Sequence, residues 1–236
     1  MKGYIEDKEF GKIYVELRRG MTNVRFTYRP DGCLLMRAPL GVSIAELQRM
    51  IEVNRARLRL LPQPEVPEMN VGQVIEGFRC HVLIEATNPR PEYVQTRWDG
   101  DALHVSVHPS ADLTDIQTRR FVSDMISRAM EYEAERMLLP FARQVASGLG
   151  VSPAGFEVGR GMRKLGHCTS QRVIQLSRNL MFYPESLVRY VICHELAHLT
   201  HMNHSPQFHA LCDQYCEGQE KALERQLRQF RYPILK

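Results

Sequence analysis

Residues 190–209 read YVICHELAHLTHMNHSPQFH and contain the pattern H-E-x-x-H. Residues four positions apart lie on the same face of an α-helix, so His194 and His198 point in the same direction. Glu195 lies about 100° further round the helix, where it can reach a water between the histidines without binding a metal itself. The spacing therefore predicts a helix that holds one metal ion, with Glu195 beside the ion.

The residues around this motif predict that its helix is buried. A helix that is apolar on all sides packs inside a protein, and burying polar side chains without partners is costly. A zinc ion would provide that partner, whereas the alternative is a pair of core histidines bonded to backbone carbonyls. The apolar residues are Leu187, Val188, Val191, Ile192, Leu196, Ala197 and Leu199.

A catalytic zinc usually takes three protein ligands, so a third is needed. His204 is the first candidate, in a bend that requires the helix to stop near His201 or Met202. Asn203 is expected to adopt the left-handed conformation in that bend. The next two residues, 205–206, then form the N-cap and the first residue of the following helix.

Two other residues compete with His204 for the third position. His201 shares a helix face with His194, but it is better interpreted as a cation at the helix C-terminus. Glu217 stands at the spacing of third glutamates carried on a later helix. The hypothesis favours His204 over both.

The string HELAHLTHMNHSPQF resembles the YgjP-like metallopeptidase-domain family, which is related to the SprT-like and WLM-type zinc proteins. The segments LGHCTSQRVIQLSRNLMFYPESLVRYVICHELAHL and RRGMTNVRFTYRPDGCLLMRAPLGVS resemble it too, so the resemblance covers nearly the whole chain. It implies that His194, His198 and His204 bind zinc and that Glu195 is catalytic. Many members have Trp-Gly-Ser-Cys where this chain has Leu-Gly-His-Cys at 165–168.

Length and composition fit a globular protein of one large domain or two small ones. The chain has 236 residues, of which 44% are hydrophobic, and a net charge of +4. No apolar run is long enough to cross a membrane, and the N-terminal segment lacks a signal core, so we expect a cytoplasmic protein. The six cysteines are then expected to be buried free thiols. The mild positive charge permits an acidic partner, but a nucleic-acid partner is not favoured.

Hydrophobic patterns predict strands first, a helix, more strands and then mostly helices, which is typical of an α+β fold. Turn signals are Pro30-Asp31-Gly32 and Asp99-Gly100. Ser43 and Glu46 form a capping box at the start of a helix that runs to about Leu60. No internal repeat is visible. The predicted strands are 11–18, 22–29, 32–37, 78–85, 93–98, 102–107, 156–162 and 172–177.

The predicted organisation is one family domain over about 10–232 with two regions. Residues 10–109 form a β-rich region of antiparallel strands and hairpins with a helix, and residues 110–236 form a zincin-like catalytic region. By the resemblance, the last strand before the H-E-x-x-H helix, 172–177, forms the edge of the cleft. An extended peptide can pair with such an edge by strand addition.

These observations predict a zinc-dependent hydrolase, specifically a metallopeptidase acting on a peptide or protein substrate. Three neutral histidines would hold a zinc ion that activates water, and Glu195 would accept the proton as general base. The oxyanion needs a stabilising group. Arg178, His209 and Tyr232 are the candidates for that role and for substrate binding.

Two alternatives remain open. The stretch 160–178 carries Arg160, Arg163, Lys164, Arg172 and Arg178 without an acidic residue. It would suit a phosphate-bearing substrate, as in a metal-dependent nucleoside triphosphate pyrophosphohydrolase, although no glycine-rich phosphate loop accompanies it. The other alternative is a non-catalytic zinc module that binds a protein or nucleic acid. The buried glutamate argues against that reading, because a structural site has no use for it.

Overall fold

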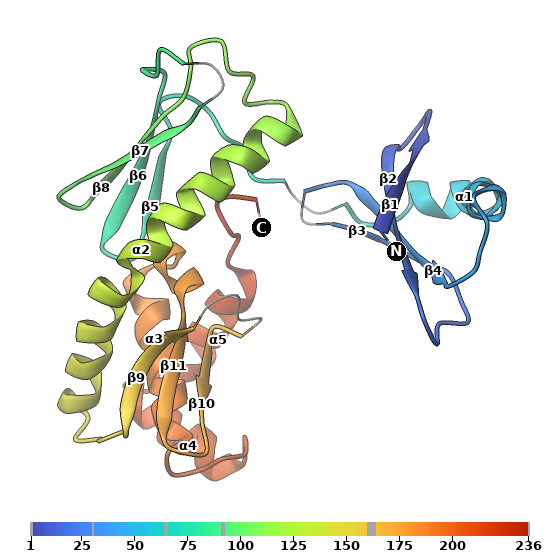
Figure 1. Ribbon diagram of the computed structural model, residues 1–236. Coiled ribbons are helices and arrows are strands. Elements are labelled where there is room, and N and C mark those ends of the chain that lie inside the picture. Colours follow the sequence, from blue (N-terminus) through green and yellow to red (C-terminus); the bar gives the residue numbers. More distant parts are fainter. Residues whose placement is uncertain (1, 30, 64–65, 91–92, 160–163, 236) are drawn as a thin grey trace. The chain divides into compact units, whose positions relative to one another are not determined.

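The computed structural model describes residues 2–29, 31–63, 66–90, 93–159 and 164–235 (Figure 1). It has the mixed α+β content that the sequence predicts. Contacts divide the chain into two compact units, which we call the N-terminal unit (Met1–Glu68 with Ile234–Lys236) and the C-terminal unit (Met69–Pro233). The predicted family domain and its two regions are a different division of the chain and stay a prediction.

The N-terminal unit is a four-stranded sheet with one helix. Its elements are β1 (Lys2–Asp7), β2 (Gly11–Arg18), β3 (Arg25–Tyr28), β4 (Leu34–Pro39) and α1 (Ile44–Arg59). The strand order is β1-β2-β4-β3. The outer pairs are antiparallel and the central pair, β2 with β4, is parallel.

Helix α1 packs on one face of this sheet. Leu47, Ile51 and Leu58 are spaced so that they share one side of the helix, and they meet Ile13 and Met36 from the sheet in one buried cluster. Burying side chains of this size contributes about 1.5–3 kcal/mol each. The remaining sides of α1 are mostly polar and exposed, as expected for a helix on a surface, although Ile44 and Val53 are exposed there too.

The capping box predicted for α1 is confirmed. The Ser43 hydroxyl accepts a hydrogen bond from the Glu46 N–H at 3.3 Å, and the Ser43 N–H donates to the Glu46 carboxylate at 2.8 Å. The helix ends one residue before Leu60, which forms its C-cap.

The C-terminal unit begins with a second sheet of the same construction. Its elements are β5 (Val74–Gly77), β6 (Cys80–Glu85), β7 (Gln95–Asp99), β8 (Ala102–Ser106) and the long helix α2 (Ile116–Gly148). The order β5-β6-β8-β7, the central parallel pair and the helix that follows repeat the N-terminal unit. The predicted hairpin between β7 and β8 is confirmed, and α2 continues through its internal proline.

A third sheet leads into the motif helix. It comprises β9 (Gly155–Gly159), β10 (Gly166–Cys168) and β11 (Val173–Ser177), followed by the 3-10 helix η1 (Arg178–Phe182) and α3 (Glu185–Ala197). The order is β10-β11-β9, with β10 antiparallel and β9 parallel to β11. This is the arrangement of β3, β4 and β2 again, without a counterpart of β1.

Two helices complete the C-terminal unit. Helix α4 (Pro206–Tyr215) begins as predicted, because Ser205 is its N-cap and its hydroxyl accepts a hydrogen bond from the Phe208 N–H at 3.3 Å. Helix α5 (Glu220–Gln229) follows after a short turn and packs on α3 and α4.

The sheets correct the expectation of purely antiparallel strands without a repeat. Each sheet contains one parallel pair, and the same three-strand arrangement followed by a helix occurs three times in the described chain. Parallel strands that pair come from separate parts of the chain, so no turn signal between adjacent strands predicts their pairing. The repeat therefore lies in the pairing of the strands and not in a visible repetition of residues.

The cysteines are all free thiols, and all but Cys33 are buried. Within the described ranges, no helix is both long and apolar enough for a membrane span. The cytoplasmic location stays a prediction.

We expect Asp7→Asn to destabilise the N-terminal unit in a pH-dependent way. The Arg55 guanidinium donates to both Asp7 oxygens, at 3.1 and 2.8 Å, and holds the pKa of that carboxyl well below its usual range. A lowered pKa stabilises the fold above the unfolded value of about 3.9, and this contribution is lost as pH falls through the folded value. Urea titrations at several pH values should show a stability difference from wild type that is full at neutral pH and shrinks in acid.

The matched control is Glu68→Gln, which removes an exposed carboxylate of the same unit. It should leave the free energy of unfolding nearly unchanged at every pH. An Asp7→Asn difference that stays constant into acid would contradict the role given to the ion pair.

Candidate active site

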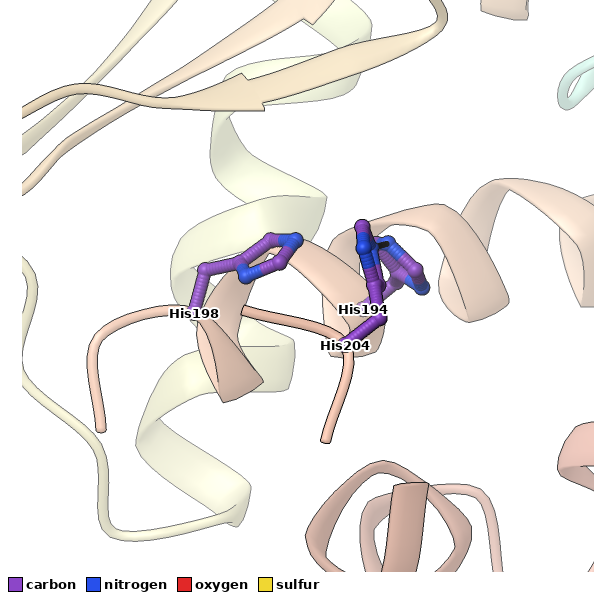
Figure 2. Close-up of side chains that lie close together, drawn as sticks. All are labelled: His194, His198 and His204. Atoms are coloured by element: carbon purple, nitrogen blue, oxygen red, sulfur yellow. Dashed lines mark hydrogen bonds between the residues drawn. The ribbon is translucent and has the colours of Figure 1, made fainter. Parts of the chain in front are cut away.

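The structure brings the predicted histidines together (Figure 2). His194 lies within α3, His198 is the C-cap of that helix, and His204 lies in the loop before α4. One turn of helix therefore supplies two imidazoles, and the return of the chain towards α4 supplies the third.

The three imidazole rings form a compact cluster that packs on the ring of Phe208. One ligand nitrogen from each ring lies within 4.8 Å of the others, and the Nε2 atoms of His194 and His204 are 3.1 Å apart. Phe208, which is fully buried, packs under all three rings with centroid distances of 4.5–4.9 Å. The first turn of α4 thus fixes the cluster from below.

The end of α3 differs from the expectation. The helix ends at Ala197 and not near Met202, and the chain turns immediately after it. The Nδ1 atom of His198 lies 3.0 Å from the backbone oxygen of His201, so the ring donates to a carbonyl that a longer helix would use internally. The predicted left-handed conformation at Asn203 is wrong, since it is not among the described residues with positive φ.

The surroundings of His194 and His198 favour the neutral form of both imidazoles. Burial, followed by the proximity of the neighbouring histidines, lowers the pKa of His194 to about 4. Burial also lowers the pKa of His198. A neutral imidazole has a free nitrogen lone pair, which is the form that binds a metal.

Glu195 is buried between α3 and β10. A Cβ atom added at Gly166 would lie 2.6 Å from both Cγ and Oε1 of Glu195, so only glycine permits this approach. Burial raises the pKa of Glu195 to about 7, while a hydrogen bond from the Cys168 backbone acts in the opposite direction. A carboxyl group with a pKa near neutrality is able both to accept and to return a proton.

The edge of the third sheet beside the cluster is β10 and not the strand 172–177 that the resemblance implied. In the observed order, β11 is the central strand. The Ser177 N–H donates to the Leu165 oxygen at 2.8 Å, and the Thr169 N–H donates to the Val173 oxygen at 2.9 Å. Antiparallel pairing alternates, so the residues between, 166 and 168, direct their backbone groups to the open side.

A cleft of about 500 Å³ lies over the histidines and Glu195. Residues 164–168 form one wall, and residues of α3 and α5 form others. Its apolar lining includes Tyr190, Val191, Met202 and Leu227. The ion pair of Arg228 with Glu224, at 2.5 Å, also borders it.

The rivals of His204 are placed elsewhere. Glu217 lies in the turn after α4 with a side chain 78% exposed, 3.7 Å from Arg189. His201 takes part through its backbone oxygen, as described above. The geometry therefore groups His204, and neither rival, with the two helix histidines.

Arg178, His209 and Tyr232 do not border the cleft in the described chain. Arg178 forms an ion pair with Glu131 of α2, and the Tyr232 hydroxyl lies 3.3 Å from the Asn179 side chain. His209 is nearest to the cluster, with its ring centroid 6.3 Å from that of His204. Their substrate-binding and oxyanion roles stay predictions.

The described arginines of the basic stretch, Arg172 and Arg178, do not border the cleft either. Arg160 and Arg163 lie outside the described residues, and the side chain of Arg172 donates to the Leu199 oxygen at 3.2 Å. Arg178 is paired with α2. Lys164 is the described residue of this stretch with a basic side chain that borders the cleft.

Sequence reasoning missed several residues that shape the site. Tyr190 precedes His194 by one helical turn and packs against it with ring centroids 6.1 Å apart, so the four-residue spacing contained this signal. Gly166 and His167 could not be assigned to a strand from the sequence, because a strand of three residues is too short to show an alternating pattern. Phe208 was visible only as an apolar residue of the next helix.

Gly166→Ala is expected to destabilise the C-terminal unit by roughly 1–3 kcal/mol, the usual cost of overpacking a tight site. The added methyl group would force the Glu195 carboxyl away from β10. Gly155→Ala is the matched control, because Gly155 lies on β9 of the same sheet and has open space at the Cβ position. Urea denaturation of both variants measures the difference, and equal stabilities would contradict the packing described.

The comparison with known families agrees with this geometry. A family model described as YgjP-like, metallopeptidase domain matches residues 22–230, which is most of the chain. No curated protein and no solved structure matches it. The match spans all three histidines, Glu195 and the strand that contacts it, and the chain therefore belongs to the YgjP-like metallopeptidase-domain family.

Proposed function

We propose that this protein is a zinc-dependent peptidase in which His194, His198 and His204 hold the metal and Glu195 is the general base. The observation that carries the proposal is the convergence of three imidazoles next to a buried carboxyl group, at the open edge of a sheet. The family of the chain, a metallopeptidase domain, supports it.

The donor set fits a zinc ion. Zinc binds imidazole nitrogen at about 2.0–2.1 Å, so nitrogens sharing one ion must come within about 4 Å of each other. The Nε2 atoms of His194 and His204 meet this condition at 3.1 Å. The bond from His198 Nδ1 to the His201 oxygen leaves its Nε2 free, which is how metal-binding histidines are usually oriented.

When bound, zinc acts as a Lewis acid on water and on a carbonyl oxygen. The role of Glu195 follows from its surroundings. Gly166 and the Cys168 N–H restrict the carboxyl group to one position beside the cluster. Held there with a pKa near neutrality, it takes a proton from the attacking water and returns it to the leaving amine.

The backbone of β10 offers the substrate a place to bind. The outward N–H and C=O groups of residue 166 are in the right orientation for an extended peptide to pair with them. Such pairing is independent of side-chain type, and the apolar lining of the cleft would then select substrate side chains. A peptide is therefore a better fit than a highly charged phosphate ester.

We expect His204→Ala to lose most of the bound zinc, because it removes one of three ligands. His201→Ala and Glu217→Ala should retain about one zinc per chain, since neither side chain belongs to the cluster. Elemental analysis of the purified proteins measures this. A Glu217→Ala protein without metal, beside a His204→Ala protein that keeps it, would refute the ligand assignment.

We expect Glu195→Gln to keep its zinc and lose about 10²–10⁴-fold in peptide hydrolysis, the usual contribution of a general base. The assay compares wild type and variant on a library of extended peptides and, in parallel, on nucleoside triphosphates. A chelator should abolish the wild-type activity.

The assay on nucleoside triphosphates distinguishes a peptidase from a nucleotide hydrolase. Phosphate release that depends on Glu195, without peptide cleavage, would replace the peptidase proposal with a nucleotide hydrolase. Full activity of Glu195→Gln on either substrate would remove the general-base role.

A further inference from the structure

The outer face of the N-terminal sheet, opposite α1, carries aromatic and basic side chains. Because side chains alternate along a strand, Ile13, Met36 and the other core residues of the sheet point towards α1. The residues between them in sequence point to the outer face. Tyr4 and Tyr14 are direct partners across β1 and β2 on this outer face. Tyr4 is 55% exposed, so part of its ring is open to a ligand.

Each tyrosine ring has a cation over it. The Lys12 ammonium lies 4.4 Å from the centroid of the Tyr4 ring, and the Arg29 guanidinium lies 4.0 Å from that of Tyr14. Aromatic faces flanked by cations are the combination that single-stranded nucleic acids bind, through base stacking and phosphate contacts.

Next to the tyrosines runs a row of charged residues across three strands. Glu16 is the parallel partner of Arg37, and Arg37 is the antiparallel partner of Arg25. Glu16 accepts hydrogen bonds from both Arg18 at 2.8 Å and Arg37 at 3.2 Å, so one carboxylate serves two guanidinium groups. The row keeps a net positive charge.

The Arg25–Arg37 pair is unfavourable by itself, because like charges directly opposite on a sheet destabilise it. Arg25 is exposed and has no ion pair with the described residues. An anion between the two arginines would offset their repulsion.

A hollow of about 370 Å³ opens at this end of the face. It is lined by Arg19, Arg25 and Arg37, with Thr22 and Asn23 from the loop between β2 and β3. Three guanidinium groups with hydroxyl and amide donors form a suitable environment for a phosphate group.

We propose that the outer sheet face of the N-terminal unit binds single-stranded nucleic acid. The hollow at Arg19, Arg25 and Arg37 takes backbone phosphates, and the exposed ring of Tyr4 stacks on a base. Flat exposed aromatic surface beside the cations favours a nucleic acid over an acidic polypeptide, which has charge but few planar groups. This binding is separate from the proposed hydrolysis in the C-terminal unit and does not depend on it.

The test measures fluorescence anisotropy of a labelled oligothymidylate with the full-length protein. Arg19→Gln with Arg25→Gln should weaken binding at least about tenfold at low salt and reduce the slope of log K against log salt by about 1.4, because two phosphate contacts are lost. Tyr4→Leu keeps an apolar side chain and should weaken binding roughly tenfold while leaving that slope unchanged.

The matched control is Arg49→Gln with Arg57→Gln, which removes the same charge from exposed positions of α1. It should bind like wild type, and circular dichroism should show all variants folded. If this control lost as much affinity for oligothymidylate as Arg19→Gln with Arg25→Gln, the proposal would be overturned, because the loss would then follow from the net charge of the protein. Competition by poly-L-glutamate as strong as that by unlabelled oligothymidylate would overturn it in favour of an acidic protein partner.

Discussion

The contact between β10 and α3 determines the rest of the candidate active site. At Gly166 the strand passes so close to Glu195 that there is no room for a side chain. This one approach buries the carboxyl group, which raises its pKa, and brings the Cys168 N–H within reach of it. Position, proton affinity and orientation of the proposed general base therefore have a common physical cause.

The histidine cluster depends on a second contact of the same kind. Phe208 supports all three rings and comes from the first turn of α4, whose start is fixed by the Ser205 cap. Because His204 directly precedes that cap, the geometry that starts α4 also directs His204 back to α3. His204 lies in a loop, but its position is fixed by the start of a helix, as the proposed metal ligand requires.

The parts of this structure that the sequence predicted are those that depend on residues a few positions apart. The histidine spacing, the Ser43 cap and the Asp99-Gly100 turn are local signals, and each was found. The parallel strand pairs depend on segments that are further apart, for which one sequence contains no local pattern. β10 pairs with the next strand along the chain, but its three residues are too few to show an alternating pattern. The end of α3 was misplaced because residues 199–201 suit a helix, and the His198 bond to a backbone oxygen ends it earlier.

The repeated strand arrangement shows why the fold alone does not determine the function. β3, β7 and β10 are equivalent edge strands, and each sheet is followed by its own helix. Helix α1 presents Leu47 and Ile51 to its sheet and forms an ordinary core. Helix α3 presents Glu195 to β10 of its own sheet, where a glycine leaves room for it. One arrangement therefore supports a packed core in one case and a candidate catalytic centre in the other, and the difference lies in a few side chains at the helix–strand contact.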